Sequence, residues 1–202
     1  MTFKDFFAKL EEDAPENKKD EIKNYLVEYA KNKNIPYPTE YLDSGSAAIT
    51  FTTNKNDVII RVQELEDDVD FYDTREYQLF DEDLQESGGV VKVHNFDLFD
   101  IDNIRYVATW KEKVDLFIQG FIMGRYKKED SNKILGALDS LCSVIWEPDR
   151  RNAISNVLKT LKSYKETKNL AIAIEKGLPM NDLAVDSNLG VNKKGKVVAF
   201  DI

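Results

Sequence analysis

Asn188 and Asp201, an amide and a carboxylate near the end of the chain, are the pair of residues best suited to chemistry. Two short β-rich runs, 189–191 and 197–200, lie between them and are separated by a Lys-Lys-Gly turn. This pattern predicts a β-hairpin that brings Asn188 close to Asp201. One neutral and one charged oxygen ligand suit Mg²⁺, which keeps several waters and bridges nucleotide phosphates. The alternative is an ordinary surface hairpin with polar ends.

A sheet that could position these residues is expected between residues 38 and 110. Two β-rich runs within 41–52 are joined by a small-residue turn, and three more follow at 58–62, 90–96 and 104–110. Such runs, joined by short turns, predict an antiparallel sheet. After the third run, segment 67–85 has apolar residues near 3.6 spacing, which predicts a helix laid across the sheet.

The apolar period changes near Val114 and stays close to 3.6 as far as Lys176, which predicts a mostly helical region with Phe117 on the apolar face of its first helix. Gly177 and Pro179 are expected to end it and to open the loop before the hairpin. Near the start of the chain, 3–12 and 16–33 have the spacing of two amphipathic helices. The class is therefore α+β, in three parts: a helical prefix at 1–37, a sheet region at 38–113 and a helical region at 114–202.

Composition limits the function classes. The chain has 202 residues and a formal net charge of −9, which argues against broad binding to nucleic-acid phosphates because that needs a basic face. No run approaches the roughly 18 apolar residues of a membrane span, and the chain does not open on a basic segment followed by an apolar run. We therefore expect a cytoplasmic protein with no membrane partner.

His94 and Cys142 are the only histidine and the only cysteine. Cys142 has no partner for an internal disulfide, and its apolar surroundings in the sequence predict a buried structural thiol. His94 lies in a predicted strand, and a Ser-His-Asp triad would depend on it alone. A zinc site built on histidines would lack a second ligand of that type. Asn188 and Asp201 are therefore the main candidates for a functional site.

In their order along the chain, several features resemble the protein-kinase-like superfamily over residues 38–201. Small residues at 44–48 are similar to a weakened glycine-rich phosphate loop. The run Val-Ile-Ile-Arg-Val resembles the strand that carries the family's lysine, with Arg61 in the lysine position. Arginine is a planar fork instead of a point charge, so this exchange is not conservative. Glu76 falls where the family's helical glutamate pairs with that basic side chain.

The hairpin completes the resemblance, because Asn188 and Asp201 match in type and separation the family's catalytic-loop Asn and the Asp of its DFG segment. The resemblance implies a protein-kinase-like bilobal fold, with a five-stranded antiparallel sheet and one helix in an N-lobe at 38–113 and a reduced helical C-lobe at 114–202. It implies ATP and Mg²⁺ as cofactors. The residues it assigns are the catalytic Asp182, Arg61 and Glu76, the metal ligands Asn188 and Asp201, and the nucleotide-binding Ser44, Gly45, Ser46, Trp110, Lys111 and Glu112.

The catalytic loop departs from the family pattern. Leu183 stands where the family has its catalytic Asp, five residues before Asn188, and Asp182 lies one residue earlier. Either a one-residue insertion restores Asp182 to the acceptor hydroxyl, or the catalytic base is missing.

Two functions follow. The first is a small phosphotransferase that uses Mg-ATP. The second is an inactive pseudokinase that acts as a binding or inhibitor protein. Segment 64–86 holds eleven Asp and Glu against one Arg, which suggests a docking surface for a basic protein partner. Small truncated proteins of this build resemble bacteriophage-encoded ones, which would place the partner, a host factor, in the host cytoplasm.

Overall fold

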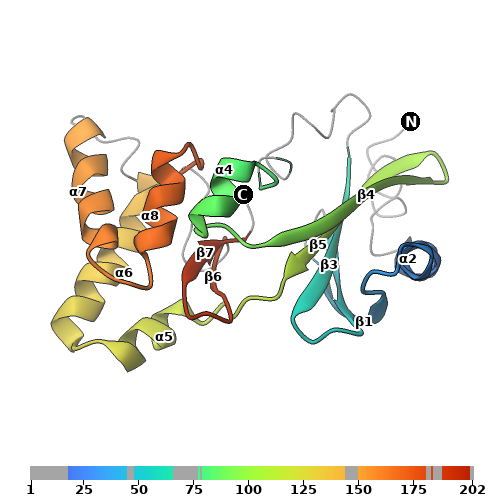
Figure 1. Cartoon of the computed structure of the whole chain (residues 1–202), viewed down its shortest axis with the longest axis horizontal. Helices are drawn as coiled ribbons and strands as arrows, with labels where there is room; N and C mark the ends of the chain where they lie inside the picture. Colours follow the sequence, from blue (N-terminus) through green and yellow to red (C-terminus); the bar gives the residue numbers. More distant parts are fainter. Residues whose placement is uncertain are drawn as a thin grey trace, which may run out of the picture. The chain divides into compact units, whose positions relative to one another are not determined.

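The computed structural model describes residues 18–44, 48–65, 77, 79–143, 150–180, 183 and 188–200. Over these ranges the fold is α+β, with six helices and seven strands (Figure 1). The chain divides into two compact units. The first comprises Met1–Asp73 and Val93–Lys113, and the second comprises Thr74–Lys92 and Val114–Ile202.

The first unit is built on a five-stranded sheet in which every neighbouring pair is antiparallel, with the order β1-β2-β3-β5-β4. The strands are β1 (Pro38–Ser44), β2 (Ala48–Thr53), β3 (Val58–Glu64), β4 (Val93–Ile101) and β5 (Ile104–Glu112). The predicted antiparallel sheet is therefore confirmed. The β4–β5 turn uses Asp102 and Asn103 with φ of 51° and 66°, a left-handed conformation that these two residue types tolerate well.

Helix α2 (Lys19–Lys33) shares one core with the sheet. Its apolar stripe buries Ile22 and Leu26 against alternate residues of the strands, including Ile60 and Trp110. Tyr25 stacks on Phe99 at 4.3 Å between ring centroids. The helix predicted at 16–33 is confirmed from Lys19 onward, whereas the one predicted at 3–12 lies outside the described residues.

Strand alternation decides which side chains lie on the other face of the sheet. Val58, Ile60 and Val62 of β3 face the α2 core. Successive strand residues point to opposite faces, so Arg61 points away from α2. Arg61 pairs in register with Thr109 of β5, and Lys111 lies two residues further along the same face.

The second unit consists of helices packed around a small hairpin. Its elements are α4 (Glu82–Ser87), α5 (Ile118–Arg125), α6 (Lys128–Ser143), α7 (Arg150–Lys162), α8 (Lys168–Glu175), β6 (Leu189–Val191) and β7 (Val197–Ala199). Helix α6 packs on α7, α7 on α8, and α8 on α4. The helical region predicted after Val114 is confirmed.

Two local predictions need correction. The predicted helix 67–85 does not run unbroken to its end, because Leu79 and Phe80 form a turn and α4 starts afresh at Glu82, capped by Asp81. Residues 66–76 and 78 lie outside the described part of the chain. Phe117 was expected on the apolar face of a helix. It instead precedes α5 and is 70% exposed, while Ile118 and Ile122 of that helix are buried.

Trp110 provides a test of the α2–sheet core. Its side chain is fully buried, and its indole N–H donates to the carbonyl oxygen of Pro36 at 2.7 Å. We expect Trp110→Phe to lower the free energy of unfolding by on the order of 2 to 3 kcal/mol, because it leaves a small void and an unpaired carbonyl. Urea denaturation followed by circular dichroism measures this loss, and a change below about 0.5 kcal/mol would contradict the packing described.

Candidate functional site

The predicted hairpin is present, and it is buried. Leu189 pairs with Ala199 and Val191 with Val197, and all six strand residues of β6 and β7 are buried. Beyond the last pair, the backbone N–H of Phe200 donates to the carbonyl oxygen of Asn188 at 3.0 Å. The two strands of the hairpin are therefore not at the surface, whereas Lys193 and Lys194 of its turn are exposed. The backbone of Asn188 lies beside the residue that precedes Asp201, and Asp201 itself lies outside the described residues.

Backbone hydrogen bonds hold both edges of the hairpin. On the β6 edge, Asp115 and Val191 exchange N–H···O=C bonds of 2.9 and 2.7 Å. On the β7 edge, Ala199 accepts from the N–H of Val91 at 2.7 Å and donates to the carbonyl of Gly89 at 2.9 Å. The short pair thus forms the centre of a four-segment ladder.

Two glycines allow the close approach that this ladder needs. A Cβ on Gly190 would lie 2.5 Å from a methyl carbon of Val114. A Cβ on Gly89 would lie 2.2 Å from the carbonyl oxygen of Asn169, at the start of α8. Any larger residue at either position would push the hairpin and its neighbours apart.

A polar cluster supports the hairpin from the loop before α8. The carbonyl of Glu166 accepts from the N–H of Val197 at 2.8 Å, and its buried carboxylate accepts a short hydrogen bond from the Tyr126 hydroxyl. Arg125 lies 3.6 Å from the same carboxylate. Burial, followed by the hydrogen bond to Glu166, raises the pKa of Tyr126 to about 12.

In the first unit, Arg61 donates to the side-chain oxygen of Gln63 at 2.9 Å, along one face of β3. Its predicted partner Glu76 lies outside the described residues, so the ion pair stays a prediction. Ser44 ends β1, and Gly45 and Ser46 of the small-residue loop are likewise not described.

Three of the residues assigned to nucleotide binding, Trp110, Lys111 and Glu112, lie inside β5 and are buried. Their register partners on β3 are Ile60, Ile59 and Val58. The strand is longer than expected, and β4 flanks Trp110 and Lys111 on its other side. Nucleotide binding by this stretch stays a prediction. Much of its backbone is already paired with β3 and β4, which leaves fewer backbone groups for a ligand.

Leu183 stands where the resemblance would place the catalytic Asp, and its side chain is fully buried. Its N–H donates to the carbonyl of Met180 at 3.1 Å. At the position of the family's catalytic Asp, the chain therefore has an apolar side chain packed inside the second unit. Asp182 lies outside the described residues.

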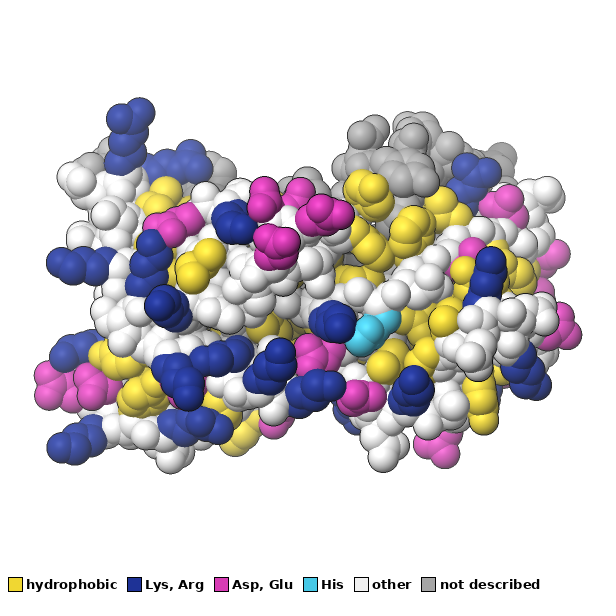
Figure 2. Space-filling view, viewed as in Figure 1, with side chains coloured by type: hydrophobic (Ala, Val, Ile, Leu, Met, Phe, Trp, Pro, Cys, Tyr) yellow, Lys and Arg dark blue, Asp and Glu magenta, His cyan; other side chains and the backbone are white. Residues whose placement is uncertain are grey.

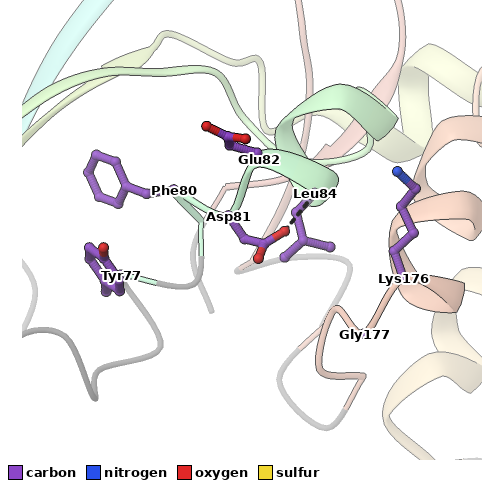
Figure 3. A pocket seen from close by; sticks show the side chains of 7 residues that line it. All are labelled: Tyr77, Phe80, Asp81, Glu82, Leu84, Lys176 and Gly177. Carbon is purple, nitrogen blue, oxygen red and sulfur yellow. Dashed lines mark hydrogen bonds between the residues drawn. The ribbon is translucent and has the colours of Figure 1, made fainter.

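The second unit also contains a cavity of about 520 Å³ that the sequence patterns did not reveal (Figure 3). Tyr77 and Phe80, whose rings stack with centroids 5.8 Å apart, lie on one side of it. The full lining is Tyr77, Phe80, Asp81, Glu82, Leu84, Lys176 and Gly177.

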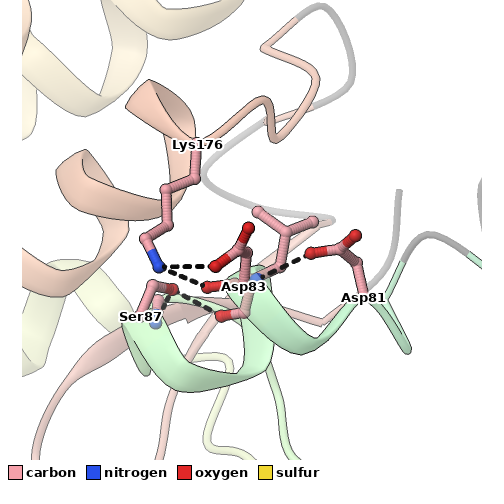
Figure 4. A network of polar contacts seen from close by, with 6 residues as sticks. Asp81, Asp83, Ser87 and Lys176 are labelled. Atoms are coloured by element: carbon pink, nitrogen blue, oxygen red, sulfur yellow. Dashed lines mark hydrogen bonds and ion pairs between the residues drawn. The ribbon is translucent and has the colours of Figure 1, made fainter.

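The polar groups near this cavity mainly hold α4 in place (Figure 4). Asp81 caps the helix by accepting from the N–H of Leu84 at 3.0 Å. Lys176 of the α8 end lies 3.1 Å from the carbonyl and 3.3 Å from the carboxylate of Asp83. Asp81 before this helix and Gly88 after it are residue types that could have indicated its bounds from the sequence.

Charge is distributed unevenly along the chain. Residues 1–113 carry 14 Lys and Arg against 26 Asp and Glu, whereas residues 114–202 carry 14 against 11. Figure 2 shows many of the basic side chains gathered over the second unit. Although the whole chain has a net charge of −9, residues 114–202 carry more basic than acidic side chains.

Known protein families and curated protein sequences provide no match for this chain. Within the described ranges, no group of three or more His, Cys, Asp or Glu residues could hold a metal ion. Over the same part of the chain, no helix is both long enough and apolar enough to cross a bilayer.

The Tyr126–Glu166 contact predicts a pH dependence. The pKa of Tyr126 in the folded state is about 12, above its ordinary value of 10.0, so the folded state holds this proton more tightly. The stabilisation is fully present below pH 10 and is lost as the pH rises from 10 to 12. We expect Tyr126→Phe to cost about 1 to 2 kcal/mol at pH 8 and progressively less above pH 10.

The measurement is the unfolding free energy of both proteins at several pH values. The control is Tyr37→Phe, which removes the hydroxyl of an exposed tyrosine in the first unit. A difference between the wild type and Tyr126→Phe that is the same at pH 8 and pH 11.5 would contradict the assignment.

Proposed function

We propose that this chain is a kinase-like phosphotransferase that binds ATP with Mg²⁺. The observation that carries the proposal is the Phe200 to Asn188 hydrogen bond at the open end of the β6–β7 hairpin. It fixes the backbone next to Asp201 beside Asn188. An amide oxygen and a carboxylate are a suitable pair of donors for a hard cation.

The sheet of the first unit supports the same proposal. Its strand order, with β5 inserted between β3 and β4, agrees with the antiparallel N-lobe sheet expected from the resemblance. Arg61 lies on the sheet face opposite α2, so its side chain is not part of the core that α2 forms with the sheet. A guanidinium there can form two parallel hydrogen bonds to phosphate oxygens.

Each residue then has a defined role. The side chains of Asn188 and Asp201 would hold Mg²⁺, which supplies charge neutralisation for the phosphates. Arg61 would bind phosphate oxygens, and Glu76 would orient Arg61. Asp182 would accept a hydrogen bond from the acceptor hydroxyl and align it for attack.

The second candidate function is a pseudokinase, and Leu183 favours it. A fully buried leucine at the family's catalytic position removes the usual base, unless Asp182 takes its place. An inactive scaffold of this kind would act by binding. The acidic segment 64–86 is our proposed contact surface for a basic protein partner, because dense like charge speeds encounter with the opposite sign.

Substitution at Asp201 tests nucleotide binding. For the wild type, ATP with Mg²⁺ at about a hundred times the dissociation constant should stabilise the protein by about 2.7 kcal/mol, measured as a rise in melting temperature. Asp201→Asn should abolish this rise while leaving the melting temperature without ligand unchanged. Asp139→Asn is the matched control, because Asp139 is an exposed carboxylate on α6.

Calorimetry provides the decisive measurement. If the wild type binds none of ATP, ADP and GTP at millimolar concentration with Mg²⁺ or Mn²⁺, both the phosphotransferase and a nucleotide-sensing pseudokinase are excluded.

Substitution at Asp182 separates the two functions. If Asp182 orients the acceptor, Asp182→Asn should leave the nucleotide affinity unchanged and abolish phosphate transfer. The measurement is transfer of labelled phosphate from ATP to the protein itself, to lysate proteins and to small-molecule hydroxyl acceptors. Nucleotide binding with no transfer by the wild type to any of these would favour the pseudokinase.

A further inference from the structure

A groove along α7 is lined by none of the residues assigned to the proposed nucleotide site. It has a volume of about 660 Å³ and is lined mainly by one face of α7, with Glu175 of α8 on its other side. The lining from α7 and the residue after it is Arg151, Ile154, Ser155, Leu158, Lys159, Lys162 and Ser163. These positions recur every three or four residues, so they form one continuous stripe along the helix.

The apolar side chains of this helix are incompletely covered. Among the thirteen residues of α7, only Leu161 is buried. Ile154 and Leu158, one helical turn apart, line the groove and remain partly exposed. Two such side chains at the bottom of a hollow favour the insertion of apolar side chains from a ligand.

The rim of the groove is basic. Helix α7 carries Arg150, Arg151, Lys159 and Lys162 and no Asp or Glu. The Nζ atom of Lys162 lies 2.5 Å from a carboxylate oxygen of Glu175, and this pair neutralises the acid among the described lining residues. Within the described part of the chain, Arg151 and Lys159 make no ion pair. The groove therefore has an apolar floor between two cations that are available to a ligand.

We propose that the α7 groove is a docking site for an acidic amphipathic helix of a protein partner. Two apolar residues of that helix, spaced one turn apart, would pack on Ile154 and Leu158. Carboxylates that flank them would lie against Arg151 and Lys159. This is the helix-in-groove mode of recognition, in which apolar anchors provide affinity and rim charges provide orientation.

The same features disfavour other anionic partners. A nucleic acid would need stacking or base-edge contacts, which aliphatic Ile154 and Leu158 do not provide. An anionic bilayer prefers apolar side chains on a convex surface, whereas these two lie in a hollow.

The test uses a capped, fluorescein-labelled peptide of about 16 residues, long enough to form a helix on docking. Leucines recur every three or four positions on one face, and glutamates occupy most of the rest. We expect binding to the full chain with a dissociation constant below about 1 mM, measured by fluorescence anisotropy at low salt. A scrambled peptide of the same composition should bind at least about tenfold more weakly, because its leucines no longer form a stripe.

Adjacent arginines provide the matched variants. Arg151 lines the groove and Arg150 does not, although both are exposed and belong to the same turn of α7. Arg151→Glu should weaken peptide binding about tenfold, whereas Arg150→Glu should change it by less than about twofold. Leu158→Ser should also weaken binding, and circular dichroism verifies that each variant is folded.

Several outcomes would overturn the proposal. These are absence of peptide binding by the wild type, equal binding of the scrambled peptide, and equal losses for Arg150→Glu and Arg151→Glu. Preferential binding of a single-stranded oligonucleotide, or of phosphatidylserine vesicles, would assign the basic face to a different class of partner. None of these measurements involves ATP, so the result is independent of the proposed phosphotransfer.

Discussion

The backbone hydrogen bonds on the two edges of the β6–β7 hairpin are the constraint on which the second unit depends. Two three-residue strands bury too little surface to be stable alone. Here Val191 is bonded to Asp115, and Ala199 is bonded to Gly89 and Val91. Segments that are far apart in the sequence therefore become one ladder, and both unpaired edges of the hairpin are satisfied.

This ladder explains features that would otherwise be unrelated. Gly89 and Gly190 are required because a Cβ would collide with Asn169 and with Val114, respectively. Glu166 is buried because its backbone binds Val197 while its carboxylate binds Tyr126 and lies near Arg125. Beyond the last strand pair, the backbone of Asn188 is bonded to that of Phe200.

The two proposals use different physical properties of the second unit. The proposed nucleotide site would depend on the side-chain oxygen atoms of Asn188 and Asp201. The α7 groove depends on partly exposed apolar and basic side chains at the outer helix of this unit (Figure 1). The residues that line the α7 groove include none of those assigned to the nucleotide site.

Local patterns in the sequence were sufficient for most of the elements. Period-two runs with turn residues between them specified five antiparallel strands. The change of period near Val114 specified the helices, and the Lys-Lys-Gly turn specified the hairpin. These features depend on residues close together in the chain, so their physical causes are local.

Tertiary structure decided what the patterns could not. The sequence predicted a strand at 104–110, but pairing with β3 extended β5 through Lys111 and Glu112. It placed one helix over 67–85, whereas capping by Asp81 starts α4 at Glu82. It did not indicate that Leu183 would be buried, that hairpin edges would bond to residues 89–91 and 115, or that α7 would leave a basic groove. The Asp81 cap is a local contact, but the others depend on contacts between residues distant in the sequence, which no local pattern encodes.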